Sequence, residues 1–174
     1  MQQLWNRLET FLQENHPEIF KDLAPPATDA EIADLENKIG VKLPDDFVAC
    51  LKIHNGQVGR ADGLFDQSEF LSTSRIFQEW SVLKGILDTE DFFDSDEEAG
   101  SSDGVKIIWW SARWIPFISY GNGDNWSIDL DPAEDGTVGQ VITFWHETFE
   151  REKEANEPYR VCRRVNILRD YPDD

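Results

Sequence analysis

Residues 114–140 read W-I-P-F-I-S-Y-G-N-G-D-N-W-S-I-D-L-D-P-A-E-D-G-T-V-G-Q. The apolar run at 114–118 is typical of a buried strand. Gly121 and Gly123 permit the positive φ angles that a tight connection needs. A second run follows the glycines and ends in another Pro- and Gly-containing turn at 132–136. The stretch therefore predicts a β-hairpin followed by a further strand.

The second run of this hairpin alternates in polarity. Ile128 and Leu130 alternate with Asp129 and Asp131. Because successive side chains of a strand point to opposite faces of the sheet, the two apolar residues share one face and the two carboxylates share the other. We therefore expect Asp129 and Asp131 to point together toward water or a partner.

Helical patterns precede the hairpin. Apolar residues at helical spacing from Leu4 predict a helix that ends near Asn15, just before Pro17. Thr28 and Glu31 form a capping-box motif at the start of a second helix that ends at Gly40. A third helix is expected from about 43 to 54, and a fourth from about 72 to 87, with a short strand or bridge at 70–71 between them.

Further strands are expected around the hairpin, at 105–110, 114–119, 126–130 and 138–145, joined by short turns. This order predicts an α+β fold, a single domain with N-terminal helices packed on one face of an antiparallel sheet of about four to six strands. If 105–110 is a strand, the consecutive Trp109 and Trp110 point to opposite faces, so one of them leaves the main core. Residues 146–174 are polar, and 159–168 could form either a closing helix or another strand.

An ordered series of short motifs runs from about residue 24 to about residue 145. It comprises P-P-A-T at 25–28, L-P-D-D-F at 43–47, H-N-G at 54–56, W-I-P-F at 114–117, G-N at 121–122, D-L-D-P at 129–132 and G-Q-V-I at 139–142. This series resembles the SUKH superfamily, with its Smi/Knr-like domain, which includes the yeast cell-wall synthesis regulator and many bacterial immunity proteins. The resemblance implies one SUKH-like domain over 1–174 and a non-enzymatic binding role. It also implies fold-defining roles for Gly121, Asn122, Asp129 and Pro132.

Charge narrows the range of partners. The 174 residues carry a net charge of −19, and residues 85–150 contain 15 acidic and only 2 basic residues. The stretch 88–104 alone has eight acids and no base, and this composition predicts a mobile acidic loop. Phosphates would be repelled by such a field, so nucleic acid and anionic membranes are not expected as partners. Charge of this kind also simply keeps a protein soluble.

Other features point to a cytoplasmic protein that needs no cofactor. The N-terminus lacks the apolar core of a signal peptide, and no apolar run reaches the roughly 18 residues of a membrane span. Cys50 and Cys162 have no neighbouring Cys or His, and they are expected to be thiols in a reducing compartment. With about 70% of the unfolded surface buried for this length, stability requires neither disulfides nor metals.

Motifs for catalysis or metal binding are weak. The three histidines lie in no nucleophile motif, and Gly121-Asn122-Gly123 lacks the third glycine and the following helix of a phosphate loop. The carboxylates near 129–135 do not fit a calcium loop, because Ala133 occupies a ligand position. We therefore expect no catalytic residues, no cofactor and no metal.

What remains is a surface for binding a protein. Acidic residues with neighbouring tryptophans would steer and anchor a cationic partner. The expected contact residues are Asp94, Asp96, Glu97, Glu98, Trp110, Asp124, Trp126, Asp129 and Asp131. The leading hypothesis is an immunity protein that neutralises a cognate toxin, such as a basic nuclease. The alternatives are a regulatory scaffold of the cell-wall regulator type and a hydrolase that uses Asp129 or Asp131.

Overall fold

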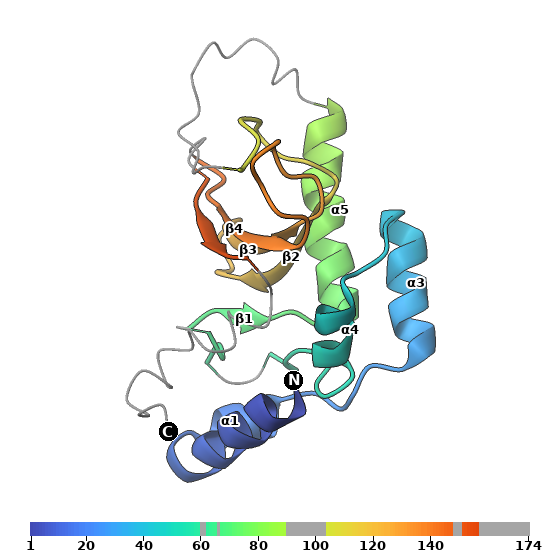
Figure 1. Cartoon of the computed structure of the whole chain (residues 1–174). Coiled ribbons are helices and arrows are strands. Elements are labelled where there is room, and N and C mark those ends of the chain that lie inside the picture. The colour runs from blue at the N-terminus through green and yellow to red at the C-terminus, as the bar shows by residue number, and fades with distance from the viewer. Residues whose placement is uncertain (60–61, 66, 90–103, 148–150, 157–174) are drawn as a thin grey trace.

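A five-stranded antiparallel sheet forms the centre of the fold in the computed structural model (Figure 1). The structure describes residues 1–59, 62–65, 67–89, 104–147 and 151–156. The strands are β1 (Glu69–Phe70), β2 (Trp114–Ser119), β3 (Asn125–Asp129), β4 (Gln140–Phe144) and β5 (Lys153–Ala155), and their order in the sheet equals their order in the chain. This confirms the predicted α+β class, the antiparallel meander and the number of strands.

The helices begin and end close to the predicted positions. They are α1 (Gln2–Asn15), α2 (Pro17–Asp22), α3 (Asp29–Ile39), α4 (Asp45–Leu51) and α5 (Thr73–Thr89). The capping box of α3 is formed, with Thr28 and Glu31 bonded reciprocally, and Gly40 adopts the left-handed cap. Pro17 ends the first helical pattern but also begins the short helix α2, which was not predicted.

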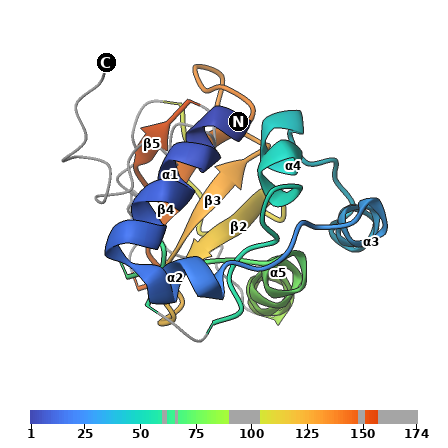
Figure 2. The same ribbon diagram turned by 90° about the horizontal axis from the view of Figure 1, so that it is seen from below.

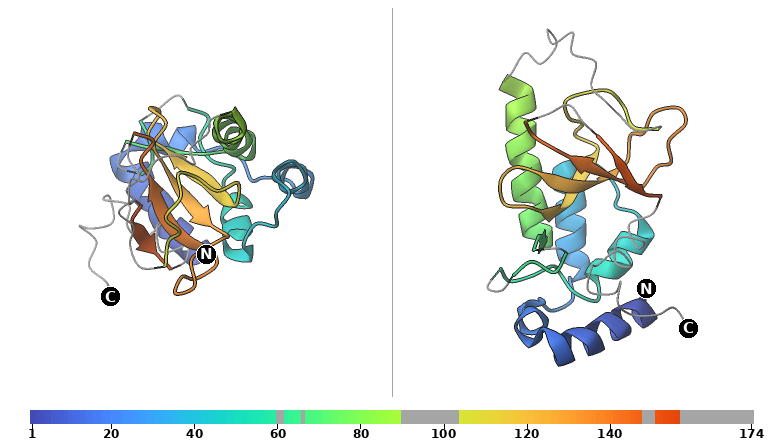
Figure 3. Two further views of the ribbon diagram at one scale, coloured as in Figure 1. Left: turned by 90° about the horizontal axis from the view of Figure 1, so that it is seen from above. Right: turned by 90° about the vertical axis from the view of Figure 1, so that its left-hand side faces the viewer.

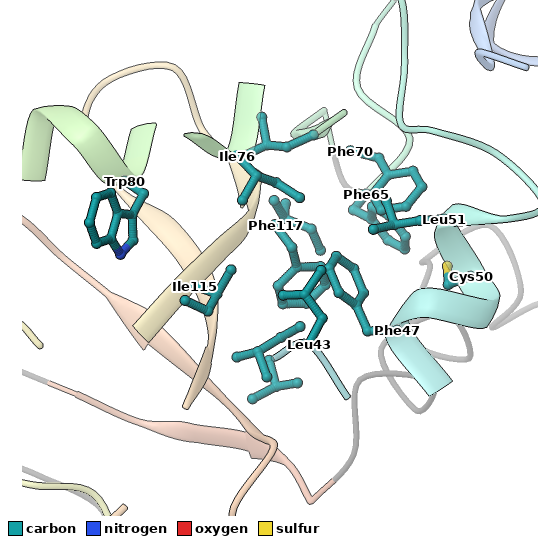
Figure 4. Packing of buried hydrophobic residues seen from close by; sticks show 14 of the residues in the cluster. Leu43, Phe47, Cys50, Leu51, Phe65, Phe70, Ile76, Trp80, Ile115 and Phe117 are labelled. Carbon is teal, nitrogen blue, oxygen red and sulfur yellow. The ribbon is translucent and has the colours of Figure 1, made fainter. Parts of the chain in front are cut away.

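One face of the sheet packs against the helices. Ile115, Ile128 and Val141 lie opposite one another on β2, β3 and β4, and all three are fully buried. Phe47 of α4 meets Phe117 of β2 edge to face, with ring centroids 5.6 Å apart (Figure 4). Helix α5 packs along β2, and α3 lies outside it against α5 (Figure 3). The predicted one-sided packing of helices thus produces a continuous apolar core.

Helices α1 and α2 lie across one end of the molecule, beyond β1 (Figure 2). Trp5, Leu8 and Leu12 of α1 are completely buried. The ring of His54, which follows α4, lies 5.0 Å from that of Trp5, and its two nitrogens lie 2.8 Å from the carbonyl oxygen of Ala24 and 2.9 Å from Glu9 Oε1. Helix α1 is therefore part of the core, held by apolar contacts and by one polar pair.

The second face of the sheet is covered as well, which contradicts two expectations. Residues 105–110 form an irregular segment with bends instead of a strand, and the ring of Trp109 packs edge-on against Phe144 at 5.8 Å. The predicted strand is wrong because β2 is already paired on both sides, by β1 and β3, and offers no edge to this segment. Arg151 lies beneath it, 1% exposed, and donates hydrogen bonds to the carbonyl oxygens of Trp109 and Trp145.

The covering segment buries the acidic face of β3. Asp129 is 0% exposed, so the expectation that it points to water is wrong. The alternation itself is present, but both faces of the strand are shielded. Trp109 and Trp110 do not follow strand geometry, and Trp110 is buried against Trp80. The acidic stretch from 90 to 103, the 159–168 segment and Cys162 lie outside the described residues, and Cys50 is buried in α4.

Candidate functional site

Asp124 is occupied in holding the turn between β2 and β3. Its Oδ1 accepts hydrogen bonds from the backbone N–H and from Nδ1 of His146, each at 2.8 Å, and its Oδ2 accepts one from Asn122 at 2.8 Å. Burial acts to raise the pKa of Asp124, but the hydrogen bonds from His146 and Asn122 outweigh it and leave the pKa below its ordinary value. The carboxylate therefore stays ionised in a structural role.

Asp129, the last residue of β3, and Asp131, just after it, are also bonded to neighbouring residues. Asp131 forms an ion pair with Lys106 at 2.7 Å, and its backbone N–H donates to Asp129. The other oxygen of Asp129 accepts a hydrogen bond from Gln140 Nε2 at 2.9 Å. Burial raises the pKa of Asp129 above its ordinary value, although these hydrogen bonds oppose the shift. A fully buried carboxylate with both oxygens bonded is poorly placed for hydrolysis.

The structure does not gather the predicted contact residues into one open acidic surface. Asp129 and Trp110 are buried, Trp126 is half-buried, and Asp124 and Asp131 are bonded to cationic or polar neighbours. The carboxylates of Asp94, Asp96, Glu97 and Glu98 lie outside the described residues. A role of these residues in contact with a partner stays a prediction.

A pocket of about 710 Å³ lies elsewhere, where three parts of the chain meet. They are the segment 24–31 that leads into α3, the turn 55–59 after α4, and the segment 69–75 that contains β1 and the start of α5. Figures 1 and 2 show the first of these passing beside the N-terminal end of α5. The lining residues are Ala24, Pro25, Pro26, Glu31, Asn55, Gln57, Val58, Gly59, Glu69, Ser72, Ser74 and Arg75.

Two side-chain amides, the buried Gln57 and the half-buried Asn55, hold the walls of this pocket in place. Gln57 Oε1 accepts hydrogen bonds from the backbone N–H groups of Leu64 and Phe70, at 2.8 and 3.0 Å, while its Nε2 donates to Asp22 at 3.2 Å. Asn55 Oδ1 accepts a hydrogen bond from the backbone N–H of Thr73 at 2.8 Å. These bonds join the turn after α4 to β1 and α5, so the pocket exists before any ligand arrives.

Gly56 is required at the centre of the turn. Its φ is +72°, and a Cβ atom there would lie 2.3 Å from the backbone nitrogen of Ser72. Only glycine allows this approach of the turn to the start of α5. The H-N-G motif at 54–56 predicts the left-handed end of the third helix, but α4 already ends at Leu51 with Lys52 as a right-handed cap, and Gly56 shapes the turn that follows. No local sequence signal marks the pocket itself, because its walls are up to about 50 residues apart in the chain.

Two ionic arrangements lie in the lining. Arg75 donates to both carboxylate oxygens of Glu69 at 3.3 Å, and also to Glu79 at 2.8 Å. The hydrogen bond to Glu69 is the main reason why the pKa of Arg75 is raised. Hydrogen bonds from the backbone N–H and hydroxyl of Thr28 lower the pKa of Glu31. Arg75 and Glu31 therefore both carry full charge near neutral pH.

The pocket carries no recognisable catalytic or metal-binding set. Its described lining contains neither histidine nor cysteine, and the hydroxyls of Ser72 and Ser74 bond to each other at 3.0 Å. Among the described residues, no group of three His, Cys, Asp or Glu side chains could hold a metal ion. No helix in the described part of the chain is long and apolar enough to cross a membrane. The arrangement suits recognition of a ligand.

A family model and individual relatives point to the same protein family. The sequence model of the SMI1 / KNR4 family (SUKH-1) matches residues 26–161. The "Glucan synthesis regulatory protein" of Neurospora crassa is 25% identical over 80% of this chain and 33% of its own length. The "Cell wall biosynthesis/cell cycle regulator smi1" of Schizosaccharomyces pombe is 29% identical over 80% of this chain and 30% of its own length.

A third relative has a different name. "F-box only protein 3" of Homo sapiens is 29% identical over 55% of this chain and 18% of its own length. The chain thus spans about a third or less of the length of the relatives it matches. The family match covers well over half of the chain and includes most of the pocket lining, and we conclude that the chain belongs to the SMI1/KNR4 family (SUKH-1).

Proposed function

We propose that this domain is a non-catalytic, protein-binding module of a regulator and that it takes a segment of its partner into the pocket between α3, the turn after α4 and the start of α5. The observation that carries this proposal is the preformed pocket, whose volume falls within the roughly 300–1,000 Å³ of typical ligand sites. The described residues of its polar walls form no recognisable catalytic set. The names of the relatives, which describe regulators of glucan synthesis, the cell wall and the cell cycle, support the regulatory reading.

Site-specific photo-crosslinking tests this function. Val58 lines the pocket and is 53% exposed, whereas Val82 on α5 is 61% exposed and does not belong to the lining. A photoreactive amino acid placed at position 58 should crosslink to a defined partner in cells, and one at position 82 should not. The two sites match in residue type and exposure. Identical crosslinks from both positions, or none from position 58, would contradict the proposal.

The capture of a basic toxin is the second candidate, and the charge distribution favours it. With 15 acidic and 2 basic residues, the stretch 85–150 would attract a cationic partner. In this version the acids at 94–98 make the contact, and the pocket is not needed. Binding that depends on these acids and is indifferent to position 58 would favour the toxin-neutralising role over the regulatory one.

A further inference from the structure

The pocket's own chemistry points to the class of side chain that it accepts, an inference that rests on the proposed function. Most hydrogen-bond donors in the lining are already in use. Asn55 Nδ2 donates to the hydroxyl of Thr73, and Gln57 Nε2 donates to Asp22 and to the carbonyl oxygen of Asp62. In the described part of the lining, an anionic ligand would therefore find few donors that are not already bonded to the protein.

Among the described lining residues Arg75 is the one cation, and its charge is compensated. Arg75 donates hydrogen bonds to Glu69, Glu79 and Gln78, so two carboxylates meet a single guanidinium. Arginine that is bonded in this way contributes little attraction for a further anion. With Glu31 included, the described residues of the lining carry a net negative charge.

Glu31 offers an oxygen atom for a ligand. Its Oε2 accepts hydrogen bonds from the backbone N–H and the hydroxyl of Thr28, at 2.8 and 2.7 Å, and the backbone N–H of Glu31 completes the capping box by donating to the Thr28 hydroxyl at 3.2 Å. The other oxygen, Oε1, receives no hydrogen bond from the described residues, and the side chain lies exposed at the pocket. The capping box already holds the carboxylate in one position, so the binding of a cation there would cost little further conformational entropy of the Glu31 side chain.

The remaining walls suit the stem of a long side chain and an extended backbone. Pro25 and Pro26 provide apolar surface without N–H groups, and Val58 adds an exposed apolar side chain on the turn. Lysine and arginine combine an apolar stem with a charged end. We propose that the pocket accepts a lysine or arginine side chain of an extended partner segment, with its charged end at Glu31 and its stem against Pro25, Pro26 and Val58.

Glu31→Gln isolates the charge from the fold. Glutamine also completes a capping box, so this variant should keep the same urea midpoint as the parent protein. Asp34→Asn is the matched control, because Asp34 lies on the same helix, is exposed, forms an ion pair with Lys38 and is not among the residues that line the pocket. The two variants change the net charge equally.

The probes are acetylated heptapeptides of sequence Ala-Pro-Ala-X-Ala-Pro-Ala, in which X is lysine, arginine, norleucine or glutamate. Binding is followed by NMR through the backbone amides of Val58, Gly59 and Ser74. Lysine and arginine peptides should shift these amides. E31Q should weaken their binding by about two- to fivefold, as for a partly exposed ion pair, and D34N should leave it unchanged.

Several outcomes would overturn the inference. They are equal binding of the norleucine peptide, tighter binding of the glutamate peptide, no binding of any peptide at these amides, or equal effects of E31Q and D34N. The crosslinking at position 58 is independent of this charge, so a partner captured there together with a failed peptide test would reject the cationic ligand and leave the proposed function standing.

Discussion

At the scale of the residue, Asp129 illustrates why a strand pattern does not reveal exposure. Alternation at period 2 places Asp129 correctly on the face opposite Ile128. Whether that face meets water depends on the covering segment at 104–113 and on Arg151, which belong to distant parts of the sequence. Burial lowers the pKa of Arg151 to about 10, so the covering cation remains charged at neutral pH.

Replacement of Asp129 should be costly. In Asp129→Asn, the amide oxygen can still accept the hydrogen bond from the N–H of Asp131, but the amide nitrogen then faces Gln140 Nε2, and both of these groups are donors. The substitution should therefore lower the free energy of unfolding by about 1–3 kcal/mol. Because the pKa of Asp129 is raised in the folded state, the folded protein binds the proton of this carboxyl more tightly than the unfolded chain does. The contribution of Asp129 to the free energy of unfolding therefore falls as the pH rises above about 4, the pKa of an aspartate in the unfolded chain.

The loss caused by Asp129→Asn should therefore be smaller at pH 7 than at pH 4, as measured by urea unfolding of both proteins at each pH. Asp131→Asn serves as the control. Its partner is the partly exposed Lys106, so the change should cost less than about 1 kcal/mol. An equal loss for Asp129→Asn at both pH values would mean that the carboxyl does not titrate differently on folding.

At the scale of the element, local sequence signals predict the helix ends well, whereas contacts between distant segments could not be predicted from the sequence. The capping box at Thr28 and the left-handed Gly40 depend only on neighbours within a few residues, and both are formed. The strand expected at 105–110 has suitable residues, but its formation required an unpaired edge of the sheet, which β2 does not have. The pocket escaped prediction for the same reason, since Gly56 meets Ser72 only after folding.

Helix α1 provides a prediction at this scale, because it precedes residue 26, where the family match begins. Leu8 is fully buried, so Leu8→Ala should lower the free energy of unfolding by about 2–5 kcal/mol. Gln13→Ala on the exposed side of the same helix should change it by less than about 0.5 kcal/mol. Urea unfolding followed by tryptophan fluorescence and circular dichroism measures both. An unchanged midpoint for Leu8→Ala would mean that α1 unfolds separately from the rest.

At the scale of the whole molecule, charge and pocket have separable roles. The net charge of −19 acts over distance and governs the rate of encounter, whereas contacts in a pocket mainly govern the rate of dissociation. Salt distinguishes the two, because it screens exposed charges over about 10 Å at 0.1 M. The same acidic stretch can therefore steer a partner toward the domain without forming the contact that holds it.

Neutralising the acids at 94, 96, 97 and 98 to their amides should slow association with a basic partner by roughly three- to tenfold at low salt, and the effect should disappear near 0.5 M salt. Stopped-flow fluorescence measures this association rate, with the partner that crosslinking at position 58 identifies. The control neutralises four exposed acids on α1–α3, namely Glu14, Glu18, Asp29 and Asp34, with the same change in net charge. If both variants slow association equally, total charge and not the 94–98 stretch determines the rate.

The surroundings of His54 tie the first helix to the wall of the pocket. One ring nitrogen lies 2.8 Å from the carbonyl oxygen of Ala24 and the other lies 2.9 Å from Glu9 Oε1, so a single imidazole bridges α1 and the segment that lines the pocket. The same ring also lies against Trp5 of α1. If α1 leaves its place, the Ala24–Pro26 wall therefore loses its anchor at the same time.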